Sequence, residues 1–258
     1  MRYLIIIFLI ISIIGCKEQI RKETTVVTPE IGELENFFHI CNEDIKKAVK
    51  IVSDYKMVAN LTHLKRMDTG GKKYYILERE NLTAMIMAVT EGTYSDLMLI
   101  NKSGLIIYTM KNDAIFGKSV KHHFADTPFL DCFNKGMNGF YIEDVSLFPD
   151  NNSQPSLFAS YPDIEEGQVR GIFIIQINID IIQSILKKES IILGTDGKYR
   201  IDENPDNLFR PFSFFDKIEI ENLKTGSKMQ FETESKRYTY YPFNYSGLDW
   251  IIIFTNRI

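Results

Sequence analysis

An apolar run at residues 169–177, VRGIFIIQI, constrains the fold of this chain more than any other segment. The sequence EEGQ at 165–168 comes directly before it, and a second apolar run at 157–161 comes before that turn. Two apolar runs joined by a short turn that contains glycine are typical of an antiparallel hairpin. We therefore expect 169–177 to be a central strand, followed by a returning helix at 179–186.

Short strands joined by tight turns recur along the rest of the chain. The turn sequences NKSG at 101–104 and TDGK at 195–198 each separate two apolar runs. The further predicted strands are residues 96–100, 105–109, 140–145, 191–194, 199–202, 228–233, 237–243 and 250–255. Because hairpins rather than strand–helix–strand units connect them, the sequence predicts an α+β fold with antiparallel sheets.

One long helix is predicted over residues 34–67. Its apolar residues follow alternating spacings of four and three, namely Leu34, Phe38, Cys41, Ile45, Ala48, Val52, Tyr55 and Ala59. Charged residues off this stripe, among them Asp44 and Lys47, are expected to face solvent. Further apolar residues widen the stripe, which favours packing against the helix's own domain. A homodimer through part of the helix is the alternative.

Two further helices are expected in the first two thirds of the chain. Thr69-Gly70-Gly71 is predicted to interrupt the chain after the long helix. A second helix is expected at 79–91, and a short one at 127–137 that starts with Thr127-Pro128.

The N-terminus, MRYLIIIFLIISIIGC, has the features of an export signal. Arg2 supplies a positive charge, and the apolar run of about 11 residues that follows is shorter than the ~20 residues of a membrane-spanning helix. We therefore predict a signal peptide at 1–15. Its end resembles a bacterial lipobox, which implies lipidation at Cys16; an uncleaved anchor is the alternative. Both interpretations place the remaining chain outside the cytoplasm.

Residues 16–33 are polar and are expected to form a tether. No later apolar run approaches membrane-spanning length, so we expect no cytoplasmic signalling module in this chain. The cleaved chain loses one positive charge, Arg2, which changes the formal net charge from −4 to −5. It has no basic stripe, so nucleic acid is not an expected partner.

Cys41 and Cys132 are expected to be buried and unpaired, because Cys41 lies on the apolar stripe; a disulfide between them is the alternative.

No catalytic or metal-binding constellation is recognisable. His122 and His123 are expected on a strand, where adjacent side chains point to opposite faces and cannot easily share a metal. The sequence GKS at 117–119 lacks the glycine that a phosphate-binding loop needs at Asn112. We therefore expect no enzyme, no metal and no cofactor.

The order of the predicted elements resembles the double Cache extracellular domain of methyl-accepting chemotaxis proteins and sensor kinases. The segments that carry the resemblance are DLMLIN at 96–101 with Gly104, Tyr108 and Gly117, FASYPDI at 158–164, GIFIIQI at 171–177, LGTDG at 193–197 with Arg200, and GLDW at 247–250. The resemblance implies two stacked PAS-like antiparallel sheets packed along the long helix. Residues 34–187 would form the larger, membrane-distal unit, and residues 188–258 a smaller membrane-proximal unit.

The resemblance also implies that the distal unit binds a small molecule. Amino-acid-binding members carry an Arg-x-Trp-Tyr element and a strand aspartate, whereas TPFLD at 127–131 lacks the Arg and Trp, and Gln176 stands at the aspartate position. A neutral amide holds an ammonium group less well than a carboxylate does, so we expect an organic anion rather than a free amino acid. The candidate binding residues, on strands expected to face a lid, are Tyr94, Tyr108, Lys121, Phe158, Ser160, Tyr161, Asp163 and Gln176.

Lys121, expected at a strand end, is the candidate partner for an anionic group. The alternative is that the aromatic candidates are core residues. We expect an extracytoplasmic lipoprotein, on the periplasmic or the surface face of a membrane, that acts as an accessory sensor for another membrane signalling protein. The second hypothesis is a structural or protein-interaction lipoprotein of the cell envelope, whose pocket is filled by its own side chains.

Overall fold

The computed structural model describes residues 28–66, 69–92, 94–148, 154–187, 189–218 and 229–258, without the side chains of 64–74. The predicted signal peptide, Cys16 and most of the predicted tether lie outside the described residues. No helix in the part that is described is both long enough and apolar enough to cross a membrane.

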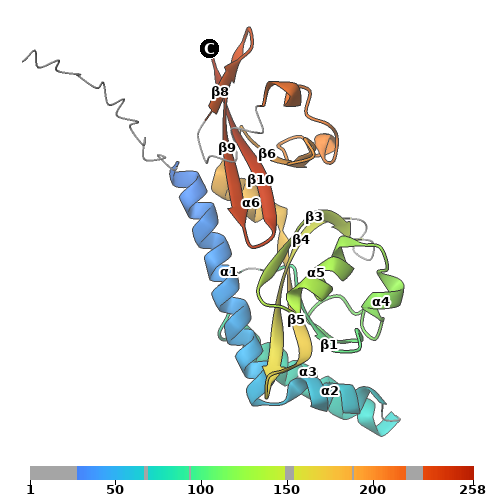
Figure 1. The fold of residues 1–258 in the computed structure, drawn as a ribbon. Coiled ribbons are helices and arrows are strands. Elements are labelled where there is room, and N and C mark those ends of the chain that lie inside the picture. Colours follow the sequence, from blue (N-terminus) through green and yellow to red (C-terminus); the bar gives the residue numbers. More distant parts are fainter. Residues whose placement is uncertain (1–27, 67–68, 93, 149–153, 188, 219–228) are drawn as a thin grey trace, which may run out of the picture.

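Two antiparallel five-stranded sheets lie one above the other beside a long helix (Figure 1). The first sheet has the order β2-β1-β5-β4-β3 and the second has the order β7-β6-β10-β9-β8. The strands are β1 (Asp96–Asn101), β2 (Ile106–Thr109), β3 (Tyr141–Phe148), β4 (Gln154–Glu165), β5 (Gln168–Asn178), β6 (Ser190–Gly194), β7 (Tyr199–Ile201), β8 (Met229–Glu232), β9 (Lys236–Tyr245) and β10 (Leu248–Arg257). The predicted α+β class with hairpin-connected antiparallel sheets is therefore confirmed.

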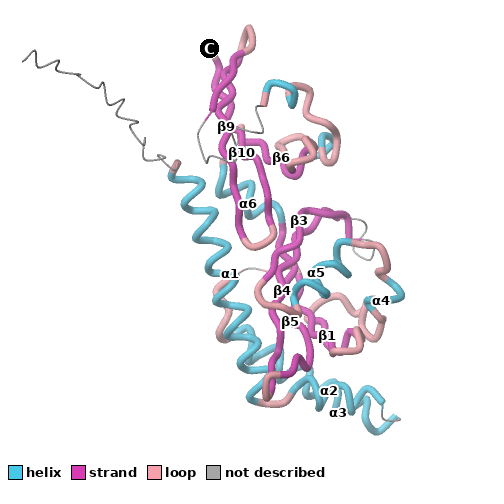
Figure 2. The backbone as a smooth tube through the Cα atoms, viewed as in Figure 1, coloured by secondary structure: helices cyan, strands magenta, loops and turns pink. Residues whose placement is uncertain are grey.

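The helices cover both faces of the first sheet and one side of the second (Figure 2). They are α1 (Pro29–Asp54), α2 (Met57–Arg66), α3 (Thr69–Met87), α4 (Val120–His123), α5 (Pro128–Gly136) and α6 (Ile179–Leu186). The predictions of α5, α6 and the central strand β5 are confirmed. The two histidines expected on a strand lie in α4 instead, and both are exposed.

The single predicted helix over 34–67 is wrong in two respects. It begins earlier, at Pro29, because a proline suits the first helical position, where its missing N–H is not needed. It is also interrupted after Asp54: Lys56 has a φ of 50°, in the left-handed region that a continuing helix cannot contain.

The predicted interruption at Thr69-Gly70-Gly71 is also wrong. Helix α3 begins at Thr69 and runs through both glycines to Met87, four residues short of the predicted end at residue 91. A glycine inside a helix costs about 1 kcal/mol relative to alanine. The apolar side of α3, with Tyr75, Leu82 and Ile86 in the core, offsets that cost.

The apolar stripe of α1 packs against the protein's own core, as the width of the stripe predicted. Its residues from Leu34 to Val52 at the predicted spacings are fully buried. Phe38 contacts the rings of Phe243, Tyr245 and Trp250 in the second sheet, with centroids 6.0, 5.6 and 6.1 Å away. Helix α1 therefore stabilises both sheets, and its stripe ends where the helix ends.

Asp44, which the sequence placed on the solvated side of this helix, is fully buried. Its Oδ2 accepts hydrogen bonds from the backbone N–H groups of Glu91 and Gly92, each at 2.7 Å, and from the Tyr94 hydroxyl at 2.8 Å. Lys47 lies 3.4 Å from its Oδ1. Asp44 thus joins α1 to the segment that leads into β1.

The first sheet has a different core on each face. We call the face that packs on α1 the helix face, and the opposite face, covered by α4 and α5, the lid face. Along β5, Phe173 and Ile175 belong to the helix-face core, and Ile172 and Ile174 belong to the lid-face core. This is the two-residue alternation of a strand buried on both sides.

The two sheets are joined at Asp144 on β3, and we call this contact the joint. Asp144 Oδ1 accepts a hydrogen bond from Trp250 Nε1 at 2.7 Å, and its Oδ2 accepts one from Arg200 Nε at 2.6 Å. The Ile142 N–H donates to the Ser246 carbonyl at 2.8 Å. The joint therefore connects the first sheet to both β10 and the β9–β10 turn of the second.

Cys41 and Cys132 are both free and buried, so the interpretation of unpaired core cysteines is confirmed. Burial raises the pKa of each thiol to about 12.

Candidate functional site

The lid face, where the sequence placed the binding pocket, is filled by aromatic side chains. Phe124, Phe129, Phe148 and Phe158 are almost fully buried and pack against one another. Their ring centroids lie 5.0 to 5.5 Å apart in the five contacting pairs. Side chains from the strands and from the lid thus meet directly at the centre of this face.

Three of the eight candidate residues lie on the lid face. Phe158 belongs to the aromatic group, and the Ser160 hydroxyl donates to the Cys132 carbonyl at 3.0 Å. Gln176 Nε2 donates to the Ser156 hydroxyl at 2.7 Å. Lys121 is not at a strand end: it lies on α4 and is exposed.

The other four candidates lie on the helix face, so the expectation that all the strand candidates face the lid is wrong. Tyr94 donates to Asp44, and the Tyr108 hydroxyl lies 2.8 Å from that of Thr83. Burial raises the pKa of Tyr108 to about 12. Tyr161 packs at the edge of the helix-face core, and Asp163, two residues further along β4, lies on the same face. The alternation along β4 separates these two residues from Phe158 and Ser160.

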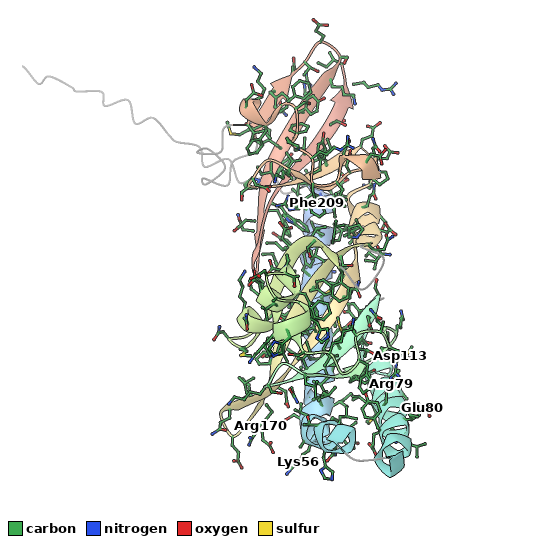
Figure 3. All side chains as sticks on the ribbon, turned by 90° about the vertical axis from the view of Figure 1, so that its right-hand side faces the viewer. Lys56, Arg79, Glu80, Asp113, Arg170 and Phe209 are labelled. Atoms are coloured by element: carbon green, nitrogen blue, oxygen red, sulfur yellow. The ribbon has the colours of Figure 1, made fainter. Side chains whose placement is uncertain are left out.

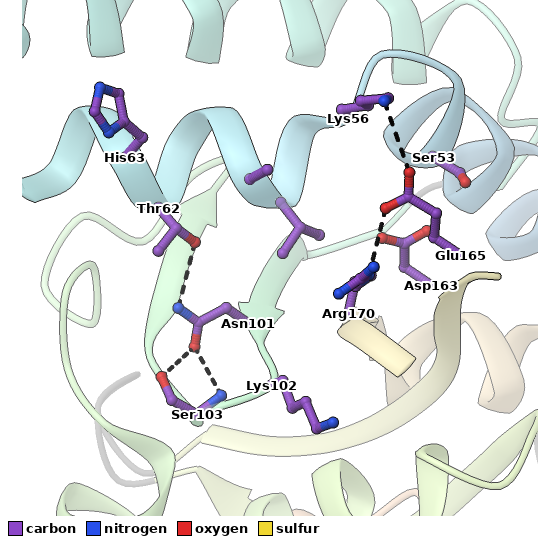
Figure 4. Close-up of a pocket in the computed structure, with 12 residues that line it drawn as sticks. Ser53, Lys56, Thr62, His63, Asn101, Lys102, Ser103, Asp163, Glu165 and Arg170 are labelled. Carbon is purple, nitrogen blue, oxygen red and sulfur yellow. Dashed lines mark hydrogen bonds and ion pairs between the residues drawn. The ribbon is translucent and has the colours of Figure 1, made fainter. Parts of the chain in front are cut away.

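A cavity of about 650 Å³ opens at the end of the first sheet that is far from the second (Figure 4). It lies where the α1–α2 break, α2, the β1–β2 turn and the β4–β5 hairpin come together. Its polar and charged lining residues are Ser53, Lys56, Thr62, His63, Asn101, Lys102, Ser103, Asp163, Glu165 and Arg170. Asp163 is the only sequence-predicted candidate among them.

Asp163 is the most deeply buried ionisable group of this cavity, with 4% of its surface exposed. Its Oδ1 has no hydrogen-bond partner among the described residues. Burial raises the pKa of this carboxyl, and the nearby Ser53 hydroxyl opposes that shift. A buried polar atom without a partner costs about 1–3 kcal/mol, so this oxygen is a ready acceptor or, when protonated, a ready donor.

Basic side chains surround the carboxylates of the cavity. Glu165 pairs with Arg170 at 3.3 Å and with Lys56 at 3.9 Å. Figure 3 places Lys56 and Arg170 together at this end of the molecule. Lys102, on the β1–β2 turn, is exposed and has no ion pair with any described residue.

Asn101 holds the β1–β2 turn in place and anchors it to α2. Its Oδ1 accepts hydrogen bonds from the N–H and hydroxyl of Ser103 at 3.1 and 2.7 Å, and from the Leu105 N–H at 3.0 Å. Its Nδ2 donates to the Thr62 hydroxyl at 3.3 Å. Gly104 supplies the positive φ, 90°, that closes the turn. Lys102 is thereby presented on a fixed loop at the rim.

A second cavity, of about 630 Å³, lies between the two sheets. Gln176 and Ser156 line it from the first sheet, and Asn178 and Asp180 line it from the start of α6. Its Gln176 and Ser156 side chains already bond each other. Tyr94 borders a third cavity of about 350 Å³. The sequence-predicted residues are therefore distributed over separate places.

The fold is similar to solved sensory domains. An extracellular ligand-binding receptor from Desulfohalobium retbaense DSM5692 matches with a TM-score of 0.63 and 10% identity, over 88% of this chain and 39% of that chain. The ligand-binding domain of the Pseudomonas aeruginosa PAO1 amino acid chemoreceptor PctC, in complex with GABA, matches with a TM-score of 0.54 and 11% identity, over 88% and 93%. The sensor domain of the V. cholerae histidine kinase DctB matches with a TM-score of 0.58 and 12% identity, over 89% and 95%.

No family model matches the chain, and no curated protein matches it. The chain has the Cache-type fold of these sensory domains, with an N-terminal helix and two antiparallel sheets. It spans 39% of the length of the first receptor described above.

Proposed function

We propose that this protein is an extracytoplasmic sensor or binding module for a small organic anion. The observation that carries the proposal is the extent of the fold match, which covers 88–89% of the chain in three sensory proteins of different kinds. Both sheets and the long helix are included in a match of that extent. The matched structures are a ligand-binding receptor, a ligand-binding domain and a sensor domain, which agrees with a binding role.

The cavity beside Asp163 is the binding site in this proposal. The lid face is occupied by its own phenylalanines, whereas this cavity is open and of a size suited to a small molecule. Lys56, Lys102 and Arg170 outnumber the two carboxylates of Asp163 and Glu165. Lys56 and Arg170 both pair with Glu165. Lys102 is therefore the basic group most available to a ligand carboxylate.

The proposal also includes the lipid anchor. The sequence that ends in Gly15-Cys16 supports acylation of Cys16, and anchoring would place the module beside another membrane signalling protein in chemotaxis or signal transduction. Stable anchoring takes more than one acyl chain. Metabolic fatty-acid labelling is expected to mark the chain, and labelling that persists in Cys16→Ser would contradict the anchor.

Thermal unfolding of the full chain in mild detergent tests the binding role. The panel comprises small carboxylates, phosphate, amines, amino acids and purines. A ligand present at 100 times its Kd adds about 2.7 kcal/mol to stability, so a carboxylate that binds is expected to raise Tm clearly. The shift should shrink in Lys102→Ala but not in Lys198→Ala, a matched change on the exposed β6–β7 turn.

A protein-interaction role is the second candidate, and one observation favours it. The four phenylalanines leave the lid face of the first sheet closed by its own side chains. A module of this kind would contact a partner through its outer surface and bind no metabolite. If no compound of the panel raises Tm, this second role is favoured over the first.

A further inference from the structure

Asp163 occupies an unusual position for a carboxylate in a cavity lined by basic groups. It projects from β4 beneath the α1–α2 break, beside Ser53 of α1 (Figure 4). Its neighbours in the cavity include Lys56 at the break, Lys102 on the β1–β2 turn and Arg170 on β5. Even so, no described residue donates a hydrogen bond to its Oδ1.

Two of the basic groups pair with another carboxylate of the cavity rather than with Asp163. Arg170 and Lys56 pair with Glu165. The Glu165 carboxylate repels the charge of Asp163, while Arg170 attracts it weakly. His63 on α2 lines the same cavity and is exposed. Burial is the main cause that disfavours the ionised form of Asp163 and raises its pKa, and the Glu165 charge acts in the same direction.

A protonated carboxyl at this position has a donor where the ionised form has none. Neutral aspartic acid carries one O–H donor, and Oδ1 is the oxygen that has no partner among the described residues. A ligand carboxylate that enters beside it would accept that hydrogen bond. An ionised Asp163 would instead repel the ligand through the low dielectric of a buried site.

We infer that this cavity binds a carboxylate together with one proton, and that Asp163 holds the proton and donates it in a hydrogen bond to the ligand. The inference rests on the proposed function, which it deepens by naming the ligand group and the control of binding. The charge balance is simple: one ligand carboxylate and one proton enter from solvent, and no covalent bond other than the Asp163 O–H forms. Lys102 then pairs with the bound carboxylate at the rim.

Proton-coupled binding has a definite dependence on pH. Above the raised pKa of Asp163 in the free protein, each unit of increasing pH should weaken binding about tenfold, because one proton must be taken up. Below that pKa, affinity should level off until the ligand's own carboxyl begins to be protonated, near pH 4–5. Binding should therefore be strongest in mildly acidic surroundings.

Isothermal titration calorimetry of the full chain in detergent tests the inference. The probes are acetate, lactate, succinate and citrate, each at pH 5.5 and pH 8 in two buffers with different ionisation enthalpies. The expected result is uptake of close to one proton at pH 8, with at least tenfold weaker binding than at pH 5.5. Measurement on the unaltered chain makes this part independent of any variant.

Asp163→Asn supplies the second arm, because an amide resembles the protonated acid in shape and carries a donor. The variant is expected to bind the same probe at pH 8 at least tenfold more tightly than the unaltered chain, with little dependence on pH. Asp113→Asn is the matched control: this carboxylate is exposed and pairs with Arg79 outside the cavity, so its pH dependence should equal that of the unaltered chain.

The possible outcomes distinguish failure of the inference from failure of the proposed function. Carboxylate binding without proton uptake, or weaker binding in Asp163→Asn, overturns the inference and leaves the proposed function standing. Absence of binding by all four probes at both pH values rejects the inference and the carboxylate part of the proposed function together.

Discussion

Asp44 and Asp163 are both buried aspartates, and they differ in what surrounds them. Asp44 accepts three hydrogen bonds through one oxygen, from two backbone N–H groups and a tyrosine hydroxyl. Asp163 has an oxygen that accepts no hydrogen bond from the described part of the chain, and burial raises its pKa. A carboxyl with a raised folded-state pKa binds its proton more tightly when folded, so stability falls as the pH rises through that pKa. The first group is suited to holding structure and the second to responding to a ligand.

Replacing Asp44 should destabilise the protein in proportion to the donors left without a partner. We expect Asp44→Ala to lower the free energy of unfolding by about 3 kcal/mol, because buried N–H and O–H groups lose a charged acceptor. Urea denaturation measures the change. Glu43→Ala is the control, since the side chain of this neighbouring residue is 46% exposed and pairs with Lys46 at 2.9 Å; its effect should stay below about 1 kcal/mol. Equal effects of the two changes would contradict the role assigned to Asp44.

The sequence could indicate which residue types make a site, but not which of them meet. Asp163 was identifiable because it follows an apolar strand in a segment that resembles Cache domains. Lys102 and Arg170 were visible only as turn and strand residues, since their proximity depends on how the β1–β2 turn lies beside the β4–β5 hairpin. Asp44 carried no signal at all: its helical position is on the charged side, and its partners lie 47 to 50 residues further along the chain.

At the scale of elements, strands were predicted better than the ends of helices. Hairpins are local: the turn residues at 101–104, 165–168 and 195–198 fix the pairing of the strands beside them. Helix ends depend on packing that the sequence does not display. The left-handed residue at the α1–α2 break is Lys56 rather than glycine, so the usual signal for a helix end is absent there. Conversely, the glycine pair near the start of α3 lies within a helix.

The α1–α2 break is also what gives the cavity its shape. Ser53 and Lys56 come from the end of α1, and Thr62 comes from α2, so the change of direction between the helices brings three side chains over the end of the sheet. Gly171 on β5 lies beneath α2, where a Cβ would come within 2.8 Å of the Ile100 carbonyl and 3.0 Å of a Val58 methyl. A side chain at this position would push the helix away from the strands.

At the scale of the whole molecule, the joint determines whether the two sheets behave as one unit. Asp144 receives hydrogen bonds from Trp250 and Arg200, which belong to the second sheet. Both residues are within segments whose likeness to Cache domains could be recognised in the sequence. Their common partner could not, because Asp144 lies 106 residues before Trp250 and in no recognisable motif.

Loss of Asp144 should loosen this connection. We expect Asp144→Ala to reduce the free energy of unfolding by about 2 kcal/mol, because two donors lose a charged acceptor at a partly exposed site. Trp250 is the only tryptophan, so its fluorescence reports on the joint and on the aromatic core beside it. In the variant, the fluorescence transition should precede the circular dichroism transition, whereas both should coincide in the unaltered chain. Asp249→Ala, on the exposed side of β10, is the control, and coincident transitions in Asp144→Ala would argue against the joint.

The two buried cysteines allow the opening of two parts of the molecule to be measured separately. Cys41 lies on the buried stripe of α1, in the core that this helix shares with both sheets, and Cys132 lies on α5 over the first sheet. With pKa values near 12, both thiols remain protonated and shielded at neutral pH, and an alkylating reagent can reach each one only while its surroundings are open. Alkylation of each cysteine, measured by mass spectrometry, would therefore report two events separately. One is how often α1 separates from the sheets, and the other is how often α4 and α5 separate from the first sheet.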